Sequence, residues 1–182
     1  MGKYTYSAPF IFFDQDGTLN QWRWIDVSIV RREGYFRTVL PHTNVIEAAA
    51  ILNRKFLIGT YGAVWQDGHS QADKDWWMDA YCSFIPLERR FYVPCGTEKA
   101  SFFRELIGRP ITKADILVDD NSDVLRAWEK YGGTGVKVVT PENSHHGTWK
   151  GFSFPYDASP ESIAAYLIAV RGVQTGIFKA LV

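Results

Sequence analysis

Short apolar runs alternate with helical patterns along this chain, and the alternation constrains the fold more than any other feature of the sequence. Each run spans four or five residues, which suits a buried strand better than a helix. The predicted strands cover residues 9–13, 55–59, 90–93, 115–118 and 136–139. Because strands that alternate with helices form parallel sheets, we expect an α/β fold with a three-layer, doubly wound parallel sheet.

Helical patterns fill the intervals between the predicted strands. The predicted helices cover residues 44–53, 72–84, 98–106, 122–131 and 159–172. Asn44, with Glu47 three residues later, predicts a capping box for the first helix. Thr97 is the candidate N-cap of the third, and Ser159 precedes a proline that suits the first position of the fifth. Residues 140–157 carry no periodic pattern, so we expect an irregular stretch there.

The composition is typical of one globular domain, which we expect to span residues 1–182. The chain is 46% hydrophobic, and 20 Lys and Arg balance 20 Asp and Glu, so the formal net charge is zero. A neutral chain lacks the basic surplus that broad binding to nucleic acid or acidic membranes requires. We therefore do not expect nucleic acid as a partner, unless a local basic patch provides the charge.

The sequence indicates a reducing compartment. Cys82 and Cys95 are too few for a disulfide framework and lack metal-ligand spacing. The N-terminus carries no apolar signal segment, and no apolar run approaches the length of a membrane span. We expect a soluble, cytoplasmic protein with no membrane partner, and nothing in the sequence indicates an oligomeric state.

Two carboxylates follow the first predicted strand directly. Asp14 and Asp16 stand one residue apart, on a turn that Gly17 opens. In such an arrangement one carboxylate can attack an electrophile, while the other protonates the leaving group and then activates water. Like charges this close need a counter-ion, and Mg²⁺ is the hard cation that oxygen ligands suit.

Further polar residues end two other predicted strands. Thr60 follows the second strand, and Asp119 with Asp120 follows the fourth, with Asp123 one helical turn later. Because ligands of doubly wound sheets bind beyond the carboxyl ends of the strands, we expect these residues to converge. Lys99, at a predicted helix start, is the candidate cation for an anionic substrate.

Four of these segments resemble the motifs of the haloacid dehalogenase (HAD) superfamily. In the order of the first to the fourth motif, the matching segments are residues 12–19 (FFDQDGTL), residues 58–60 (IGT), Lys99 and residues 118–120 (VDD). The resemblance covers roughly residues 10–140 and implies a HAD-like Rossmannoid sheet of strand order 3-2-1-4-5. It also implies a minimal cap insert at residues 19–35. Lys74 and Lys113 lie outside the window of the third-motif lysine.

A narrower resemblance is to the 5′(3′)-deoxyribonucleotidases of this superfamily. Residues 34–41 and the helix that follows are similar to one of their segments, and Trp76-Trp77 is similar to part of another. The chain departs from their pattern because the interval between Leu19 and Gly34 is short. Their base and sugar pocket is built from this interval, so the resemblance indicates a nucleotide substrate less firmly than a phosphatase reaction.

The superfamily resemblance assigns catalytic and phosphate-binding roles to four side chains. Asp14 would attack the phosphoryl group and form an aspartyl-phosphate, and Asp16 would act as acid and then as base. Thr60 would hydrogen-bond a phosphate oxygen, and Lys99 would neutralise the phosphoryl charge. Alternatively, Thr60 and Lys99 are an ordinary strand threonine and a solvated lysine.

The resemblance also implies a Mg²⁺ site. Asp14, Asp119 and the backbone carbonyl of Asp16 would hold the ion, and Asp120 would orient a metal-bound water. The spacing leaves Asp123 open as the second acidic residue in place of Asp120.

These assignments predict a Mg²⁺-dependent phosphomonoester hydrolase for a small phosphorylated substrate, best matched by a (deoxy)nucleoside 5′-monophosphate. Trp22 and Trp24 would lie in the cap, as a substrate lid that stacks on a base or as lid core. The alternatives are a phosphatase for a phosphorylated nucleic-acid end or protein, and a non-catalytic HAD scaffold used for binding. His145 and His146 lack further metal ligands at suitable spacing and predict a surface loop.

Overall fold

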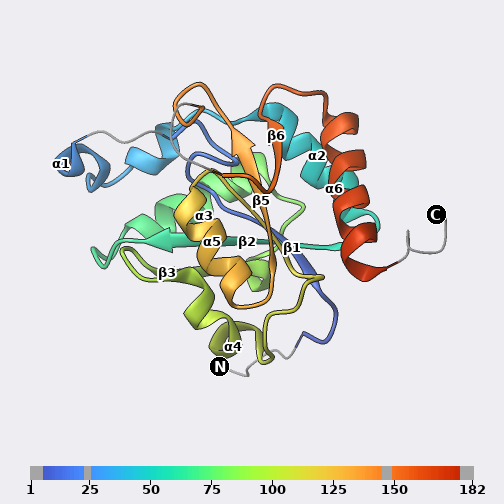
Figure 1. The fold of residues 1–182 in the computed structure, drawn as a ribbon. Coiled ribbons are helices and arrows are strands. Elements are labelled where there is room, and N and C mark those ends of the chain that lie inside the picture. Colours follow the sequence, from blue (N-terminus) through green and yellow to red (C-terminus); the bar gives the residue numbers. More distant parts are fainter. Residues whose placement is uncertain (1–5, 23–25, 145–148, 177–182) are drawn as a thin grey trace.

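A six-stranded parallel sheet forms the centre of the molecule (Figure 1). The computed structural model describes residues 6–22, 26–144 and 149–176. The strand order is β3-β2-β1-β4-β5-β6, and every neighbouring pair is parallel. The strands are β1 (Phe10–Phe13), β2 (Leu57–Val64), β3 (Arg90–Pro94), β4 (Ile116–Asp119), β5 (Thr134–Val139) and β6 (Phe152–Pro155). The predicted α/β fold and the order 3-2-1-4-5 are confirmed, and a sixth strand extends the sheet beyond β5.

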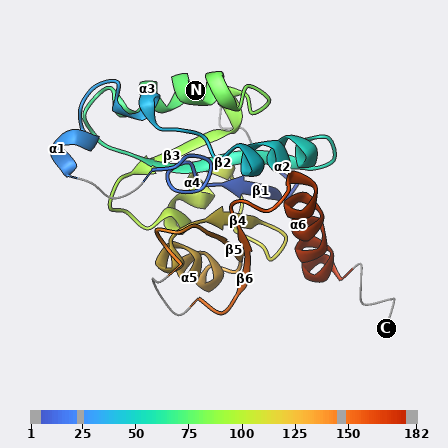
Figure 2. The same ribbon diagram turned by 90° about the horizontal axis from the view of Figure 1, so that it is seen from above.

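Helices cover both faces of the sheet (Figure 2). The helices are α1 (Val27–Val30), α2 (Thr43–Asn53), α3 (Ser70–Tyr81), α4 (Phe103–Ile107), α5 (Ser122–Lys130) and α6 (Pro160–Thr175). Short 3-10 segments occupy Tyr35–Thr38, Leu87–Arg89 and Lys99–Phe102. Helices α2, α3 and α6 pack on one face, and α4 and α5 pack on the other. Within the described ranges, no helix combines the length and the apolar character needed to cross a bilayer.

Strand β1 is buried on both faces because it lies between two neighbours in a covered sheet. Ile11 and Phe13 point into the core beneath α2 and α3, while Phe10 and Phe12 point into the core beneath α4 and α5. A strand buried on both faces reads as a continuous apolar run, which is what the sequence carries here. The Phe12 ring packs edge-on against Trp128 of α5, at 5.9 Å between centroids. These contacts fix the end of β1, where the first-motif carboxylates begin.

Two of the predicted helix caps are wrong, because both side chains have other partners. Asn44 lies inside α2, and its Nδ2 donates to the carbonyls of Asp157 (3.2 Å) and Ala158 (3.0 Å) before α6. Thr97 donates its hydroxyl to the Pro94 carbonyl at 2.6 Å, and the predicted third helix splits into a 3-10 segment and α4. Asn44 therefore ties two helices of one layer together instead of capping its own.

The C-terminal third holds one strand that the sequence pattern did not indicate. Strand β6 lies within the stretch expected to be irregular and pairs with β5 from Phe152 to Pro155. Only Phe154 of β6 is buried, so the run is too short and too polar for the apolar signal. The predicted opening of α6 is confirmed: the Ser159 side chain accepts from the Ser162 N–H, and proline follows it. The helix ends at Thr175, three residues later than expected.

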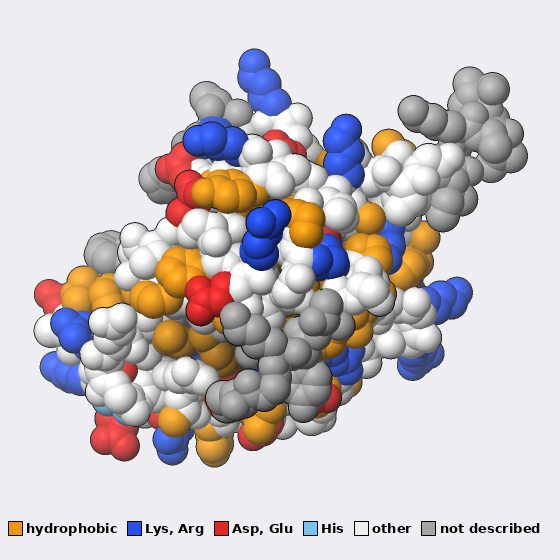
Figure 3. All heavy atoms as spheres, turned by 90° about the horizontal axis from the view of Figure 1, so that it is seen from below, with side chains coloured by type: hydrophobic (Ala, Val, Ile, Leu, Met, Phe, Trp, Pro, Cys, Tyr) orange, Lys and Arg blue, Asp and Glu red, His pale blue; other side chains and the backbone are white. Residues whose placement is uncertain are grey.

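Charged side chains of both signs share the surface. Figure 3 shows one face of the molecule, on which Lys and Arg are interspersed with Asp and Glu among hydrophobic side chains. On this face, the described basic residues form no continuous field. Charges of opposite sign are therefore mixed on this face.

Candidate active site

Two aspartates lie side by side at the carboxyl edge of the central strands. Asp14 follows β1 directly, and Asp119 is the last residue of β4. Phe13 pairs with Val118, and the Asp14 backbone N–H donates to the Val118 carbonyl at 2.8 Å. Because both strands are buried, their register is fixed, and it brings the two carboxylates to one point of the sheet edge.

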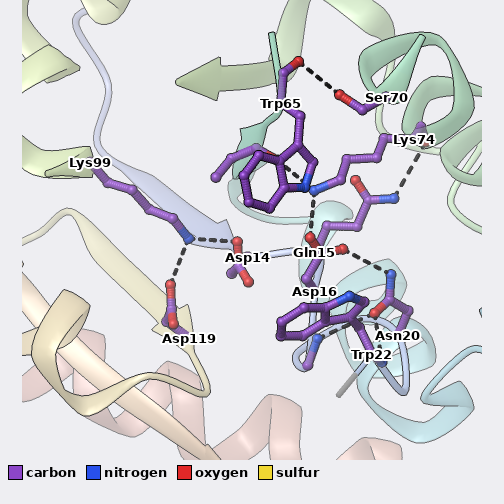
Figure 4. A network of polar contacts seen from close by, with 12 residues as sticks. Asp14, Gln15, Asp16, Asn20, Trp22, Trp65, Ser70, Lys74, Lys99 and Asp119 are labelled. Atoms are coloured by element: carbon purple, nitrogen blue, oxygen red, sulfur yellow. Dashed lines mark hydrogen bonds and ion pairs between the residues drawn. The ribbon is translucent and has the colours of Figure 1, made fainter. Parts of the chain in front are cut away.

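Lys99 lies between these two aspartates (Figure 4). Its Nζ donates to Asp14 Oδ1 at 2.5 Å and to Asp119 Oδ2 at 2.8 Å, and all three residues are buried. Burial by itself lowers the pKa of Lys99, but the Asp119 and Asp14 carboxylates outweigh this effect and raise the pKa. The ammonium therefore stays charged, and phosphate binding by Lys99 stays a prediction.

Two carboxylates of this site, those of Asp14 and Asp120, have raised pKa values. Burial raises the pKa of Asp14 to about 7, with Lys99 opposing the rise and Asp119 and Asp16 adding to it. Burial, followed by the charges of Asp119 and Asp14, also raises the pKa of Asp120 well above its ordinary value. Both pKa shifts arise because burial disfavours the charged form of each carboxylate and because negative charges lie close together. The cluster therefore favours the addition of a positive charge.

A divalent cation fits this cluster. One carboxylate oxygen from each of Asp14, Asp119 and Asp120 lies within 4.8 Å of the other two. Three hard oxygen donors suit Mg²⁺, the ion that the sequence implies. Gly17 adopts φ +78°, and a Cβ there would lie 2.6 Å from the Asp120 carboxyl carbon. Only glycine therefore allows the first-motif turn to approach Asp120 this closely.

The structure places Asp120, and not Asp123, in the carboxylate cluster. Asp123 lies in the first turn of α5, exposed, and pairs with Arg126 at 2.5 Å. Asn121 caps α5 by accepting from the Asp123 and Val124 N–H groups. Metal binding through Asp120 and through the backbone carbonyl of Asp16 stays a prediction.

The Asp16 side chain is held from two sides. Its Oδ2 accepts from Lys74 Nζ at 2.5 Å, and its Oδ1 accepts from Asn20 Nδ2 at 3.3 Å. Asn20 Oδ1 in turn accepts from the N–H groups of Gly17 (3.2 Å) and Trp22 (3.0 Å). The turn that carries the second carboxylate is thus cross-linked within itself and joined to α3.

Lys74 is the residue of this site that the sequence argument set aside. It lies on α3, only 1% exposed, one turn before the buried Trp77 and Met78. The helical spacing of 74, 77 and 78 was the available signal, because it places a lysine on the apolar face of a predicted helix. A buried lysine in that position needs a partner of opposite charge, and the Asp16 carboxylate is that partner.

The structure does not bring Thr60 to a strand end. Strand β2 continues to Val64, because β3 pairs with it as far as Pro94, so the predicted end of the strand at residue 59 is wrong. Thr60 is fully buried opposite Phe13, and within the described part of the chain its hydroxyl has no hydrogen-bond partner. The position beside Asp14 is Gly62, where a Cβ would lie 3.9 Å from Asp14 Oδ1. Phosphate binding by Thr60 stays a prediction.

The segment expected to form a cap is joined to α3 and to the loop before it. Asp73 of α3 is fully buried and accepts from the Gly34 N–H and from Arg37 Nε, both at 2.6 Å. The Arg31 guanidinium, next to α1, lies 5.6 Å from the centroid of the Trp65 ring. These contacts join the segment between β1 and α2 to the side of the site that carries Lys74.

Of the two predicted lid tryptophans, Trp22 lies among the described residues and Trp24 does not. Trp22 is half-buried and follows the Asp16 turn, as Figure 4 shows. Trp24 lies outside the described residues, as do His145 and His146. The lid role of both tryptophans therefore stays a prediction.

Solved structures of other proteins share this fold. The D,D-heptose 1,7-bisphosphate phosphatase of B. bronchiseptica, complexed with magnesium and phosphate, is similar with a TM-score of 0.61 and 16% identity, covering 88% of this chain and 98% of that one. A candidate HAD-like phosphatase of Mesorhizobium loti is similar with a TM-score of 0.55 and 13% identity, covering 96% and 92%. DsGPDH of Dunaliella salina has a TM-score of 0.51 and 15% identity, over 88% of this chain and 29% of its own length. No protein-family model and no curated protein matches the sequence. The likenesses show that the chain has the HAD-like fold.

Proposed function

We propose that this protein is a Mg²⁺-dependent phosphomonoester hydrolase that acts through an aspartyl-phosphate on Asp14. The observation that carries the proposal is the buried Lys99 ammonium between Asp14 and Asp119, with Asp16 two residues from the proposed nucleophile. Phosphoryl transfer depends on positioning and on charge stabilisation more than on covalent chemistry. A fixed carboxylate, a fixed ammonium and a carboxylate cluster that favours a cation provide both.

The proposed reaction has two steps. In the first, an Asp14 carboxylate oxygen attacks phosphorus, the bond from phosphorus to the ester oxygen breaks, and Asp16 gives a proton to the departing oxygen. In the second, Asp16 takes a proton from water, the water oxygen attacks phosphorus, and inorganic phosphate leaves as the Asp14 carboxylate is restored. Lys99 offsets the charge of the phosphoryl oxygens throughout.

Mg²⁺, when bound, would neutralise phosphoryl charge and orient the phosphate. Asp14, Asp119 and Asp120 would hold it with the backbone carbonyl of Asp16. The similar heptose bisphosphate phosphatase was solved with magnesium and phosphate, which supports this pairing of ion and ligand.

The proposed substrate is a (deoxy)nucleoside 5′-monophosphate. Its support is the motif resemblance together with Trp22, a half-buried indole directly after the Asp16 turn. A planar base can stack on such a ring. Trp65 is a second half-buried indole, beside Arg31 of the segment expected to form the cap, and it adds to this support.

A substrate panel tests the proposal. The purified chain, with and without Mg²⁺, is given p-nitrophenyl phosphate, deoxynucleoside 5′-monophosphates, sugar phosphates, a 3′-phosphorylated oligonucleotide and a phosphopeptide. We expect Mg²⁺-dependent release of phosphate from the aryl ester and the highest kcat/KM on a nucleotide. A higher kcat/KM on the oligonucleotide or peptide would replace the nucleotide assignment, and no hydrolysis of any ester by folded protein would overturn the phosphatase.

A trapping experiment tests the intermediate separately. Acid quenching during turnover of a ³²P-labelled ester should leave label on Asp14, located by peptide mapping. The Asp14→Asn variant should carry none. Label on another residue would contradict the assignment of the nucleophile even if the protein is a phosphatase.

A further inference from the structure

We propose that Lys74 is a positioning residue that holds the Asp16 carboxylate in its working orientation. The inference rests on the proposed function, in which Asp16 serves as acid and base. Lys74 itself contacts neither Asp14 nor Asp119 among its described partners, and it would act on the reaction only through Asp16.

The Lys74 ammonium is buried with a complete set of partners. Nζ donates to Asp16 Oδ2 and to the Ala63 carbonyl, both at 2.5 Å, and lies 4.5 Å from the centroid of the Phe36 ring. A buried ammonium is strongly unfavourable without such partners, so its position is tightly determined. Among the described partners, Asp16 supplies the only carboxylate, which makes the pair the main reason that the charge is tolerated there.

The helix that carries Lys74 is fixed relative to the Asp16 turn. The Lys74 backbone carbonyl accepts from Gln15 Nε2 at 3.4 Å, which ties the helix directly to the first-motif segment (Figure 4). The preceding residue, Asp73, accepts hydrogen bonds from the Gly34 N–H and from Arg37 Nε. Lys74 therefore presents its charge from a helix that is hydrogen-bonded to the first-motif segment, and its carboxylate partner there is the half-buried Asp16.

The two lysines of the site serve different carboxylates. Lys99 bridges Asp14 and Asp119, whereas Lys74 holds one oxygen of Asp16 while Asn20 holds the other. Without the Lys74 ammonium, the hydrogen bond to Asn20, a residue of the same turn, is the one that the Asp16 carboxylate keeps among the described residues. A carboxylate held at one oxygen can rotate away from the leaving group, and displacement of about 1 Å can slow a reaction about 100-fold.

The test compares substrates with a good and a poor leaving group, because acid catalysis matters most when the leaving group is poor. Single-turnover phosphorylation of the enzyme is measured with an aryl phosphate and an alkyl phosphate, in Mg²⁺, for wild type, Lys74→Met, Asp16→Asn and the double variant. Lys113→Met, a change at an exposed lysine outside the site, is the matched control. Circular dichroism melting reports whether each variant is folded.

We expect Lys74→Met to lose at least about tenfold more rate on the alkyl ester than on the aryl ester, as Asp16→Asn does. The double variant should be within about threefold of Asp16→Asn alone, because Lys74 acts through that carboxylate. Equal losses on both esters, or losses that multiply in the double variant, would show a merely structural role and overturn the inference.

A second variant covers the case in which Lys74→Met does not fold. Lys74→Arg keeps the charge but moves the donors, and it should show the same preference for aryl over alkyl esters to a smaller degree. An unchanged ratio in folded Lys74→Arg would also overturn the inference. If wild type itself forms no phosphoenzyme with either ester, the proposed function fails, which is a different result from an active wild type with insensitive Lys74 variants.

Discussion

The two buried lysines of the site stand on opposite sides of the first-motif turn, and the surroundings of the two differ. On the Lys99 side, both carboxylate partners come from the ends of central strands and are buried. On the Lys74 side, the partner is a half-buried residue of a turn, 21% exposed at the side chain, and the neighbouring segment between β1 and α2 is held by side-chain contacts. Sheet register therefore builds one half of the site, and side-chain pairing builds the other.

This difference has a functional consequence under the proposed reaction. The nucleophile and the phosphate charge need a fixed frame, which strands provide. The acid and base must face first an ester oxygen and then water, so a turn that is braced at two oxygens suits it better than a buried strand end. The most informative substitutions change residues on the Lys99 side or on the Lys74 side and leave the residues of the other side unchanged.

Removing the nucleophile should produce the largest effect. Asp14→Asn preserves the shape but cannot form an aspartyl-phosphate, so we expect kcat on p-nitrophenyl phosphate to fall by about 10⁴-fold or more. The melting temperature should show that the variant is folded. Activity close to that of wild type would mean that the reaction does not proceed through Asp14.

Removing Lys99 should lower the free energy of unfolding more than removing Lys74 does. Lys99→Met leaves two buried carboxylates without their shared cation, and we expect a loss of about 3–5 kcal/mol in the free energy of unfolding. Lys74→Met leaves a carboxylate that can turn toward water, so its loss should be smaller, about 1–3 kcal/mol. Urea denaturation of both variants measures the difference, and the reverse order would contradict the contrast drawn here.

Magnesium should stabilise the carboxylate cluster on the Lys99 side. At a Mg²⁺ concentration one hundred times its Kd, linkage predicts a gain of about 2.7 kcal/mol in unfolding free energy. Asp120→Asn should remove most of this gain, whereas the matched change Asp123→Asn, at an exposed residue of α5, should keep it. Equal responses of the two variants would place the ion elsewhere.

The smallest expected effect is a pH dependence on the turn side. His42 is buried at the start of α2, its Nδ1 lies 3.0 Å from the Thr18 carbonyl, and burial lowers its pKa below the ordinary value of 6.5. Because the pKa of His42 is lower in the folded protein than in the unfolded chain, its contribution to the free energy of unfolding is complete above pH 6.5. This contribution is lost as the pH falls from 6.5 through the pKa of the folded protein.

The matched measurement is the urea midpoint of wild type and His42→Gln at pH 8 and pH 5.5. Wild type should lose more stability between these pH values than the variant, because only wild type must protonate a buried imidazole. The difference between the two proteins isolates His42 from other titrating groups. Identical pH dependence would show that His42 contributes nothing to it.

Much of the Lys99 side could be predicted from the sequence. The apolar runs before Asp14 and Asp119 define buried parallel strands, and parallel pairing brings their ends together by geometry alone. The prediction for Thr60 used the same reasoning and misplaced the end of β2, because Gly62 and Ala63 continue the strand only by pairing with β3. A strand end is visible in a sequence when a polar residue stops an apolar run, and β2 has no such stop at its true end.

The Lys74 side could not be predicted by that reasoning. A lysine on a helix is ordinarily solvated, and nothing local to residue 74 indicates that Asp16, 58 positions earlier, lies against it. The same holds for Asn44, whose position suits a capping box although its amide serves the loop before α6. In both cases a contact between distant segments outweighs the local pattern.

By itself, the sequence determined the layered parallel fold and placed aspartates at the ends of two of its strands, whereas the strand order came from the motif resemblance. The fold and these strand ends follow from local patterns, because strand burial and the side-chain period depend on residues close together in the chain. Only the tertiary structure decided that Asp120 rather than Asp123 joins the cluster, that Thr60 lies within a strand, and that Lys74 holds Asp16. Those features depend on desolvation and on pairing between side chains far apart in the sequence. The free energies of both are set only when the chain is folded.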